Sequence, residues 1–146
     1  MGLFTGLSIS ASGLSANSTW MDVIANNIAN ANTTRTPQGG PYRREEVVFS
    51  ALPSSSFASV LQGATTSQNA VGNGVAIQSI VQDPSPFKLV YDPSNPNAVN
   101  GYVQMPNVNT STEMVDLLTA SHAYQANVTA FNAAKQVDVQ ALQIGK

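Results

Sequence analysis

Heptad patterns at the two ends of the chain constrain its fold more than any other feature. In the N-terminal segment, four apolar residues stand seven positions apart: Leu7, Leu14, Met21 and Ile28. In the C-terminal segment, steps of three and four residues alternate, so that every second position is again seven apart. These positions are Met114, Leu117, Ser121, Tyr124, Val128 and Phe131. A sustained period of 3.5 residues is typical of helices that pack against another helix along their length. The two ends are therefore predicted to form long helices.

Residues that end or cap a helix set the expected limits of these two helices. Asn and Thr residues at 30–34 favour local side-chain hydrogen bonds over helix continuation. A turn rich in Pro and Gly follows at 36–41. Before the second helix, Thr110, Ser111 or Thr112 is expected to act as the N-cap, with Glu113 in the first turn. We expect an N-terminal helical domain over residues 1–34 and a C-terminal one over 113–146.

The middle region, residues 35–112, is predicted to hold short strands and loops. Strands are expected at 43–49, 75–81, 87–91 and 101–105, and Asn100-Gly101 is a hairpin-type turn. The segment Pro53 to Asn69 is rich in Ser, Thr, Ala and Gln and is expected to be a mobile loop. The predicted fold class is α+β: long N- and C-terminal helices paired as an antiparallel coiled coil, with a small β-rich and irregular middle region.

Composition argues against several classes of function. Charged residues make up 10% of the 146 residues, whereas globular proteins average about 25%. The net charge of −2 provides no basic surface for nucleic acid. The absence of cysteine excludes thiolate metal sites and cysteine nucleophiles. A surface with so little charge suits packing against copies or relatives, and we expect no cofactor and no metal.

Candidate catalytic residues are few and badly placed. His122 is the only histidine and follows Ser121 on a predicted helix, where adjacent residues do not face each other. Glu45 and Glu46 are neighbours on a predicted strand and would point to opposite faces, so they cannot form the carboxylate pair of a glycan hydrolase. The run 43–46 is either a solvated strand edge or a set of charges that pairs with a neighbouring subunit.

The N-terminal segment lacks the marks of a membrane or secretory sequence. It has no basic start followed by a continuous apolar run, and no part of the chain approaches the roughly 20 apolar residues of a membrane span. Its helix is polar and contains Gly6 and Gly13, which each cost about 1 kcal/mol relative to Ala. We expect this end to be disordered in the monomer and to become ordered on assembly.

Three stretches of the chain resemble one protein family. The first is Asn-Asn-Ile-Ala-Asn-Ala-Asn-Thr at 26–33, preceded by Ser-Gly-Leu at 12–14. The second comprises Glu-Met-Val-Asp-Leu-Leu at 113–118 and Ala-Tyr-Gln-Ala-Asn-Val at 123–128. Together they resemble the bacterial flagellar rod and hook axial proteins. A third stretch, at 91–108, is similar to the C-type proximal rod members of this family.

The chain departs from the family pattern at four positions. His122 and Thr129 stand where members often carry Arg and Glu, and Asn95 and Asn97 stand where His and Asp are common. These changes remove charge, so particular salt bridges between subunits are in doubt.

The resemblance implies a structural function. Family members form the α-helical inner layer of a hollow tube and lack enzymatic activity. They leave the cytoplasm unfolded through the flagellar type III export apparatus, without a cleaved signal peptide, and polymerise in the periplasm into the drive shaft that links the membrane ring to the hook. Implied partners are copies of this chain, other proximal and distal rod proteins, and the rod–ring junction protein, with no nucleic acid and no direct membrane insertion.

The expected assembly interface combines the heptad residues with the Asn motifs. It comprises Leu7, Leu14, Met21, Asn26, Asn27, Ile28, Asn30, Met114, Leu117, Leu118, Tyr124, Asn127, Val128 and Phe131. From the pattern alone, the two helices could also pack only on each other within a monomer. Alternatives for the whole chain are another rod-type axial protein, such as a B-type member, and a soluble periplasmic adaptor that binds a partner helix.

Overall fold

The computed structural model describes residues 5–52 and 72–144. Its elements, in chain order, are helix α1 (Thr5–Ala29), strands β1 (Glu45–Ala51), β2 (Val75–Gln82), β3 (Lys88–Tyr91) and β4 (Tyr102–Met105), and helix α3 (Thr110–Ile144). The predicted loop Pro53 to Asn69 lies outside the described residues. The fold is α+β with two long helices, as the sequence predicted, and the four strands form two antiparallel pairs.

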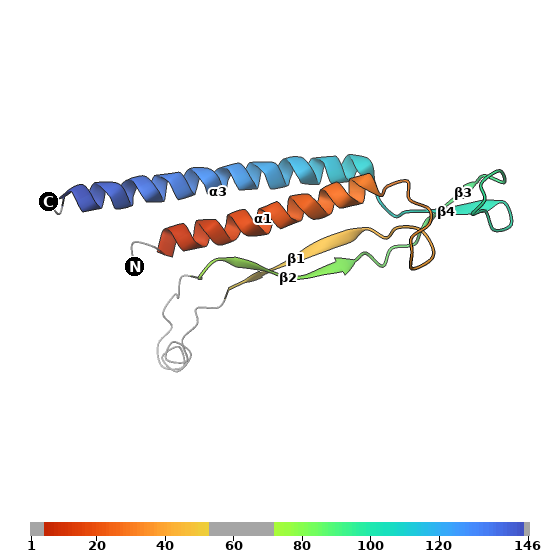
Figure 1. Cartoon of the computed structure of the whole chain (residues 1–146), viewed down its shortest axis with the longest axis horizontal. Helices are drawn as coiled ribbons and strands as arrows, with labels where there is room; N and C mark the ends of the chain where they lie inside the picture. Colours follow the sequence, from red (N-terminus) through yellow and green to blue (C-terminus); the bar gives the residue numbers. More distant parts are fainter. Residues whose placement is uncertain (1–4, 53–71, 145–146) are drawn as a thin grey trace, which may run out of the picture.

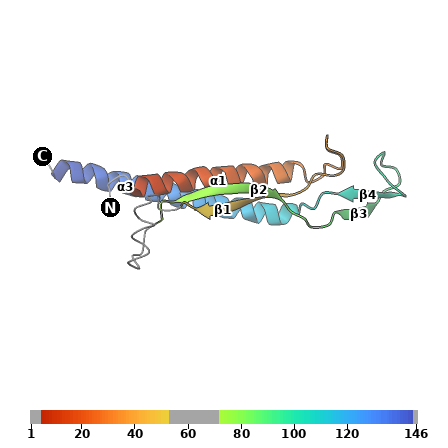
Figure 2. The same ribbon diagram turned by 90° about the horizontal axis from the view of Figure 1, so that it is seen from below.

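The helices and the β1–β2 pair form three layers that lie side by side and share one long axis. Helices α1 and α3 lie side by side and run in opposite directions, and the β1–β2 pair lies along α1 on the side away from α3 (Figure 1). In the perpendicular view, the helices and the β1–β2 pair overlap, and the β3–β4 hairpin extends beyond the helices at the end opposite the C-terminus (Figure 2). Helix α1 is therefore the central layer.

Helix α3 begins earlier than predicted, and its N-cap is Asn109. The Oδ1 atom of Asn109 accepts hydrogen bonds from the backbone N–H groups of Ser111 at 3.1 Å and Thr112 at 3.5 Å. The expectation that Thr110, Ser111 or Thr112 caps the helix is therefore wrong, because those residues already lie inside it. Asn is as good an N-cap as Ser or Thr, since its side-chain oxygen satisfies the same N–H groups.

The end of α1 follows the prediction closely. The helix ends at Ala29, and the side chain of Asn30 donates to the backbone carbonyl of Asn26 at 3.0 Å. The hydroxyl of Thr33 donates to Oδ1 of Asn30 at 3.1 Å. These local bonds offer the backbone an alternative to another helical turn.

Two hydrogen-bonded positions attach the β1–β2 hairpin to α1. At one end, the backbone N–H of Val75 donates to Oγ of Ser12 at 3.1 Å. At the other end, Asn27 bonds both the N–H and the C=O of Glu45, at 2.9 and 2.8 Å. Fifteen helical residues separate Ser12 from Asn27 and cover about 22 Å. The eight residues of β2 cover a similar length, about 23 Å between their first and last Cα atoms.

The register of the β1–β2 pair contains one irregularity. Val47 pairs with Ile80 and Phe49 with Ile77, and the register shifts between Val48 and Phe49. On the face toward α1, the ring of Phe49 packs edge-on against Trp20, with centroids 5.7 Å apart. This aromatic contact anchors the middle of the hairpin between the two hydrogen-bonded positions.

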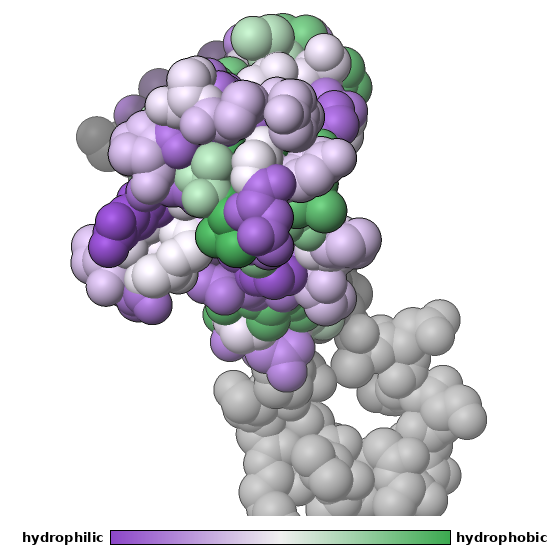
Figure 3. Space-filling model, turned by 90° about the vertical axis from the view of Figure 1, so that its right-hand side faces the viewer, coloured by the Kyte–Doolittle hydropathy of each residue, from purple (hydrophilic) through white to green (hydrophobic). Residues whose placement is uncertain are grey.

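Residues 92–101 join β3 to β4, and they end in the predicted Asn-Gly turn, which connects the bridged residues Val99 and Tyr102. Asn100 and Gly101 have φ angles of 54° and 81°, as a two-residue type I′ turn requires. The rings of Tyr91 and Tyr102 pack edge-to-face across the strand pair, with centroids 5.3 Å apart. Seen from this end, hydrophobic residues reach the surface among hydrophilic ones (Figure 3), and the hairpin contributes Leu89, Val90, Tyr91, Val99 and Tyr102 to the exposed apolar residues.

The buried core is small and lies mainly along α1. Its fully buried apolar residues are Ala16, Val23, Ile24, Val103 and Ala120. Gly13 is also buried and lets α3 approach closely, because a β-carbon at this position would lie only 2.9 Å from Nδ2 of Asn127. Such a thin core leaves many large apolar side chains exposed on α3.

Candidate assembly site

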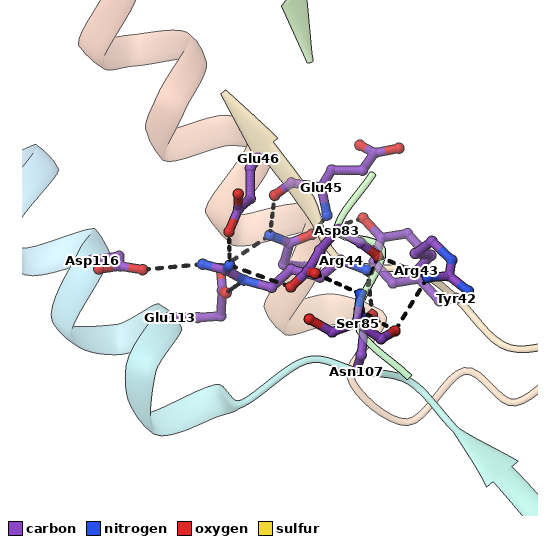
Figure 4. Close-up of polar contacts among 11 residues, drawn as sticks. Tyr42, Arg43, Arg44, Glu45, Glu46, Asp83, Ser85, Asn107, Glu113 and Asp116 are labelled. Atoms are coloured by element: carbon purple, nitrogen blue, oxygen red, sulfur yellow. Dashed lines mark hydrogen bonds and ion pairs between the residues drawn. The ribbon is translucent and has the colours of Figure 1, made fainter. Parts of the chain in front are cut away.

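A cluster of polar side chains joins both helices to the β1–β2 hairpin, and we call it the junction cluster. Its members come from the end of α1, the first residues of β1 and the segments that flank the β1–β2 hairpin, the segment before α3, and the first turns of α3 (Figure 4). They are Asn27, Tyr42, Arg44, Glu46, Asp83, Asn107, Glu113 and Asp116. Their positions in the sequence are far apart, so this cluster exists only in the folded chain.

Asn27 is the centre of the cluster on α1. It is 1% exposed, and each of its side-chain atoms has partners. Its Nδ2 group donates to the carbonyl of Glu45 and, at 3.0 Å, to Oε2 of Glu113. Its Oδ1 atom accepts from the N–H of Glu45 and, at 2.9 Å, from the hydroxyl of Tyr42. The amide group suits this position because it offers donors and an acceptor at once.

Glu113 supplies a fully buried carboxylate from the first turn of α3. It is 0% exposed, and its second oxygen, Oε1, forms an ion pair with Nε of Arg44. A buried charge is tolerated only when it is paired and hydrogen-bonded. Asn27 and Arg44 together meet that need, so this contact ties both helices to the strand that begins at residue 45.

Arg44 is surrounded by four carboxylates. Besides Glu113, it pairs with Glu46, with Asp116 through Nη2 at 3.4 Å, and with Asp83 through Nη1 at 3.9 Å. Burial lowers the pKa of the guanidinium, but the hydrogen bond and charge of Glu113, with Glu46 and Asp116, raise it overall. Arg44 therefore stays charged, and the cluster keeps an excess of negative charge.

Tyr42 is held in its neutral form. Burial raises its pKa to about 12, and the charges of Glu45 and Glu113 act in the same direction. The neutral hydroxyl is the donor that Asn27 Oδ1 accepts. The pKa shift and the hydrogen bond thus favour the same protonation state.

A second set of contacts fixes the loop that follows β2. Asn107 accepts from the backbone N–H of Arg44 at 2.8 Å and donates to the carbonyl of Asp83 at 3.2 Å. The guanidinium of Arg43 donates to the same carbonyl at 2.8 Å and lies 4.3 Å from the ring centre of Phe87. Hydrogen bonding by Ser85 lowers the pKa of Asp83, and the two arginines act in the same direction.

This arrangement is suited to holding elements in place. The carboxylates of Glu113 and Asp116 are occupied by Arg44, and that of Asp83 accepts the backbone N–H of Ser85. Over residues 5–52 and 72–144, no group of three or more His, Cys, Asp or Glu side chains is placed to hold a metal ion. None of the helices in that part of the chain is long and apolar enough to cross a membrane.

The residues predicted for assembly differ widely in exposure. Asn27 is buried, whereas Met114 and Leu118 are 56% and 62% exposed. Asn26 is also exposed. The remaining residues of the predicted set are half-buried: Leu7, Leu14, Met21, Ile28, Asn30, Leu117, Tyr124, Asn127, Val128 and Phe131.

The heptad pattern did not identify the fully buried face of α1. That face consists of Ser10, Gly13, Ala16, Val23, Ile24 and Asn27. Small residues fill it in the first half of the helix, because α3 on one side and the hairpin on the other leave little space. Large heptad residues such as Leu14 lie beside this face and keep part of their surface exposed.

Sequence reasoning missed the role of Arg44 and Glu113. The charges at 43–46 were expected to be solvated or to pair with a neighbouring subunit, but Arg44 pairs within the chain. Glu113 was expected only to favour the helix dipole. One signal was available: Glu113 and Asp116 are the only acids in the first half of the predicted C-terminal helix.

Two family profiles match the two helical ends. A profile described as "Flagella basal body rod protein" matches residues 7–35, which contain most of α1. A profile described as "Flagellar basal body rod FlgEFG protein C-terminal" matches residues 99–144, which contain β4 and α3.

Curated relatives match over their full length. Proteins named flagellar basal-body rod protein FlgC are 45% identical in Bacillus subtilis and 38% identical in Salmonella typhimurium, with 100% of both chains covered. The protein of that name in Borreliella burgdorferi is 43% identical, with 99% of this chain and 98% of the relative covered. The chain therefore belongs to the flagellar basal-body rod protein family.

Proposed function

We propose that this protein is a structural subunit of the proximal rod of the bacterial flagellar basal body, the periplasmic shaft that transmits torque to the hook. The observation that carries this proposal is the full-length similarity to relatives named as C-type rod proteins, at 38% identity or more. The structure adds a long helix pair with exposed apolar side chains on α3, including Met114, Leu118 and Val137. An elongated subunit with such a surface is suited to side-by-side packing.

In the assembled rod, α1 and α3 pair as an antiparallel coiled coil of the inner layer. The antiparallel contact of the two helices supports this arrangement (Figure 1). Residues 1–34 and 113–146 form the inner core, and residues 35–112 form the smaller middle region. The residues of the predicted interface other than the buried Asn27 then contact neighbouring subunits through the surfaces that the single chain leaves exposed.

The proposed partners are other axial proteins and further copies of this chain. They include the other proximal rod proteins, the distal rod protein and the rod–ring junction protein, and the chain reaches them through the flagellar type III export apparatus without a cleaved signal peptide. The protein acts as a scaffold and not as an enzyme. Support comes from the relatives, which are named as rod proteins, and from the ion-paired state of Arg44, Glu113 and Asp116.

A deletion strain tests this function directly. We expect loss of swimming and missing rods in isolated basal bodies, both restored by the full chain but not by a chain lacking residues 1–32. Leu14→Asp and Val128→Asp should abolish assembly while leaving export intact, because each places a charge in a half-buried helix surface. Ser15→Asp, at an exposed neighbouring position, is the matched control. Normal rods without this protein would contradict the proposal.

A further inference from the structure

The Asn100-Gly101 turn is held by hydrogen bonds on both sides of its central peptide group. Val99 donates to the carbonyl of Tyr102 at 2.9 Å and accepts from its N–H at 3.0 Å. The carbonyl of Gly101 accepts from the N–H of Asp92 at 3.0 Å. Among the described residues, the peptide group between Asn100 and Gly101 has no hydrogen-bond partner. This one peptide group can therefore rotate while the bonds around it stay in place.

Rotation of this peptide group interconverts the two turn types that close two-residue hairpins. The φ angles of Asn100 and Gly101, 54° and 81°, are those of a type I′ turn, in which ψ of the first residue is about 30°. In a type II′ turn the first residue keeps its positive φ, but its ψ is about −120° and φ of the second residue is about −80°. Glycine adopts either sign of φ at little cost, so Gly101 permits both types. Type II′ is the minor form here, because it favours glycine at the first position, where this chain has Asn100.

The minor turn brings the backbone nitrogen of Gly101 to the side-chain carbonyl carbon of Asn100. A bond between these two atoms closes a five-membered ring, and that ring requires the nitrogen to eclipse Cβ of Asn100 about the Cα–C bond. In an L-residue, Cβ is offset from the residue's own nitrogen by about 120° about this bond, so the eclipse occurs at a ψ of about −120°. Type II′ has this ψ, whereas type I′ turns the nitrogen of Gly101 away by about 150°.

We propose that Asn100 is a site of spontaneous deamidation, in which rotation of the turn supplies the reactive geometry. Hydroxide removes the proton of the Gly101 N–H, and the nitrogen forms a bond to Cγ of Asn100. The bond from Cγ to Nδ2 breaks, and Nδ2 leaves as ammonia with a proton from water, which regenerates hydroxide. Water then opens the resulting succinimide at either carbonyl and leaves aspartate or isoaspartate. The Asn100 side chain is exposed and borders a cavity of about 710 Å³, so water and hydroxide reach it.

Both products alter the tip of the β3–β4 hairpin. Each replaces a neutral amide with a carboxylate and so adds one negative charge to a chain whose net charge is −2. Isoaspartate also inserts one methylene group into the backbone between Val99 and Tyr102, which a two-residue turn cannot accommodate without loss of its hydrogen bonds. The edge-to-face contact of Tyr102 with Tyr91 lies directly beside this turn. Deamidation therefore loosens the tip, and the reaction does not depend on the proposed rod function.

The chain contains a second Asn-Gly pair, Asn73-Gly74, in a different setting. Gly74 lies against α1, because a β-carbon built on it would lie 3.5 Å from Cα of Ile9 and overlap the side chain of Ser12. Its carbonyl accepts from the N–H of Leu52 at 2.9 Å, and the N–H of Asn73 donates to the carbonyl of Leu52 at 3.4 Å. Rotation of this peptide group is blocked by the helix, so Asn73 serves as the internal control.

Mass spectrometry of peptides from the folded, full-length chain measures both rates in one sample. After incubation at pH 8, we expect Asn100 to deamidate at least tenfold faster than Asn73, and methylation by an isoaspartyl methyltransferase identifies the isoaspartate. In urea, which unfolds the chain, the two rates should lie within twofold of each other, because glycine follows both residues. Equal rates in the folded chain, or a faster reaction at Asn73, would overturn the proposal.

A disulfide across the strands separates rotation within the hairpin from opening of the hairpin. Leu89 and Gln104 are direct cross-strand partners, both are exposed, and the chain contains no cysteine. In the oxidised Leu89→Cys, Gln104→Cys chain, the rate at Asn100 should stay within twofold of the rate in the same chain with its thiols reduced. A tenfold loss on oxidation would mean that the strands must separate first, and rotation within the closed hairpin would be wrong. Asn100→Gln, which would have to close a larger ring, should lower the rate at this position at least tenfold.

Discussion

The side-chain amide of Asn127 on α3 occupies the space where a β-carbon on Gly13 of α1 would lie. The distances from that position to Nδ2 and Cγ of Asn127 are 2.9 and 3.0 Å. The amide is itself held by a 3.1 Å hydrogen bond to the carbonyl of Ala123. A glycine inside a helix weakens the helix, and here it permits the close approach of a polar side chain from the partner helix.

Substitutions of two glycines in α1 should have opposite effects. Gly13→Ala is expected to lower the free energy of unfolding by about 1 kcal/mol, because overpacking of about 1–3 kcal/mol outweighs the gain in helix propensity. Gly6→Ala should raise it by about 0.5–1 kcal/mol, since only the Cβ of Ala134 lies nearby, at 3.9 Å. Urea denaturation measures both. Adding Asn127→Ala should reverse the loss at position 13; if it does not, the clash is not the cause.

Removal of Arg44 should strongly destabilise the junction cluster. Arg44→Met leaves the buried carboxylate of Glu113 with Asn27 as its remaining partner, and breaking a buried ion pair costs about 3–5 kcal/mol. The double variant Arg44→Met with Glu113→Gln should recover part of that loss, because it removes the uncompensated charge. A double-mutant cycle by urea denaturation measures the coupling. If the effects of the two substitutions on the free energy of unfolding were additive, the ion pair between Arg44 and Glu113 would not contribute to stability.

Gly74 and Gly72 form a matched pair for a test of the Ser12 attachment. Gly74 has a φ of 116°, and a β-carbon on it would overlap Oγ of Ser12. Gly74→Ala should therefore lower the free energy of unfolding by about 2 kcal/mol or more, through backbone strain and loss of the bond to Val75. Gly72→Ala meets nothing within 4 Å and should change it by less than about 0.5 kcal/mol. Equal effects at both positions would contradict this attachment.

The chain should lose stability at high pH through Tyr42. Its pKa is raised from 10.0 to about 12 in the folded chain, so the folded state holds this proton more tightly than the unfolded state. The resulting stability is fully present below pH 10 and is lost as the pH rises through 12. Unfolding by urea at pH 8 and at pH 11 measures the loss, and Tyr42→Phe should reduce it. Phenolate absorbance should show a titration step near pH 12 that is absent from the Tyr42→Phe variant.

The sequence was sufficient to predict the elements that depend on local signals. The end of α1 near Asn30, all four strands and the Asn100-Gly101 turn were predicted within a few residues, because periodicity and turn residues act over short distances. The N-cap at Asn109 was missed since several neighbouring residues are almost equally good caps.

The junction cluster could not be predicted for a physical reason. Arg44 and Glu113 are 69 residues apart in the chain, and their pairing depends on where the hairpin lies on α1. The Asn motif at 26–32 was predicted to lie in the assembly interface, and nothing in its sequence distinguishes Asn27, which is buried, from Asn26, which is exposed. Which of the two side chains is buried depends on which side of α1 faces the hairpin and α3, and the packing of the complete fold sets that orientation.

The two attachment points at Ser12 and Asn27 couple the length of α1 to the length of the β1–β2 hairpin, although the two elements rise by different distances per residue. A residue inserted into α1 turns all later side chains by about 100°, and a residue inserted into a strand exchanges its faces. An insertion in only one of the two elements would therefore separate Ser12 from Val75 or Asn27 from Glu45. The helix and the hairpin are thus matched in length between these two points, and a change in the length of one requires a compensating change in the other.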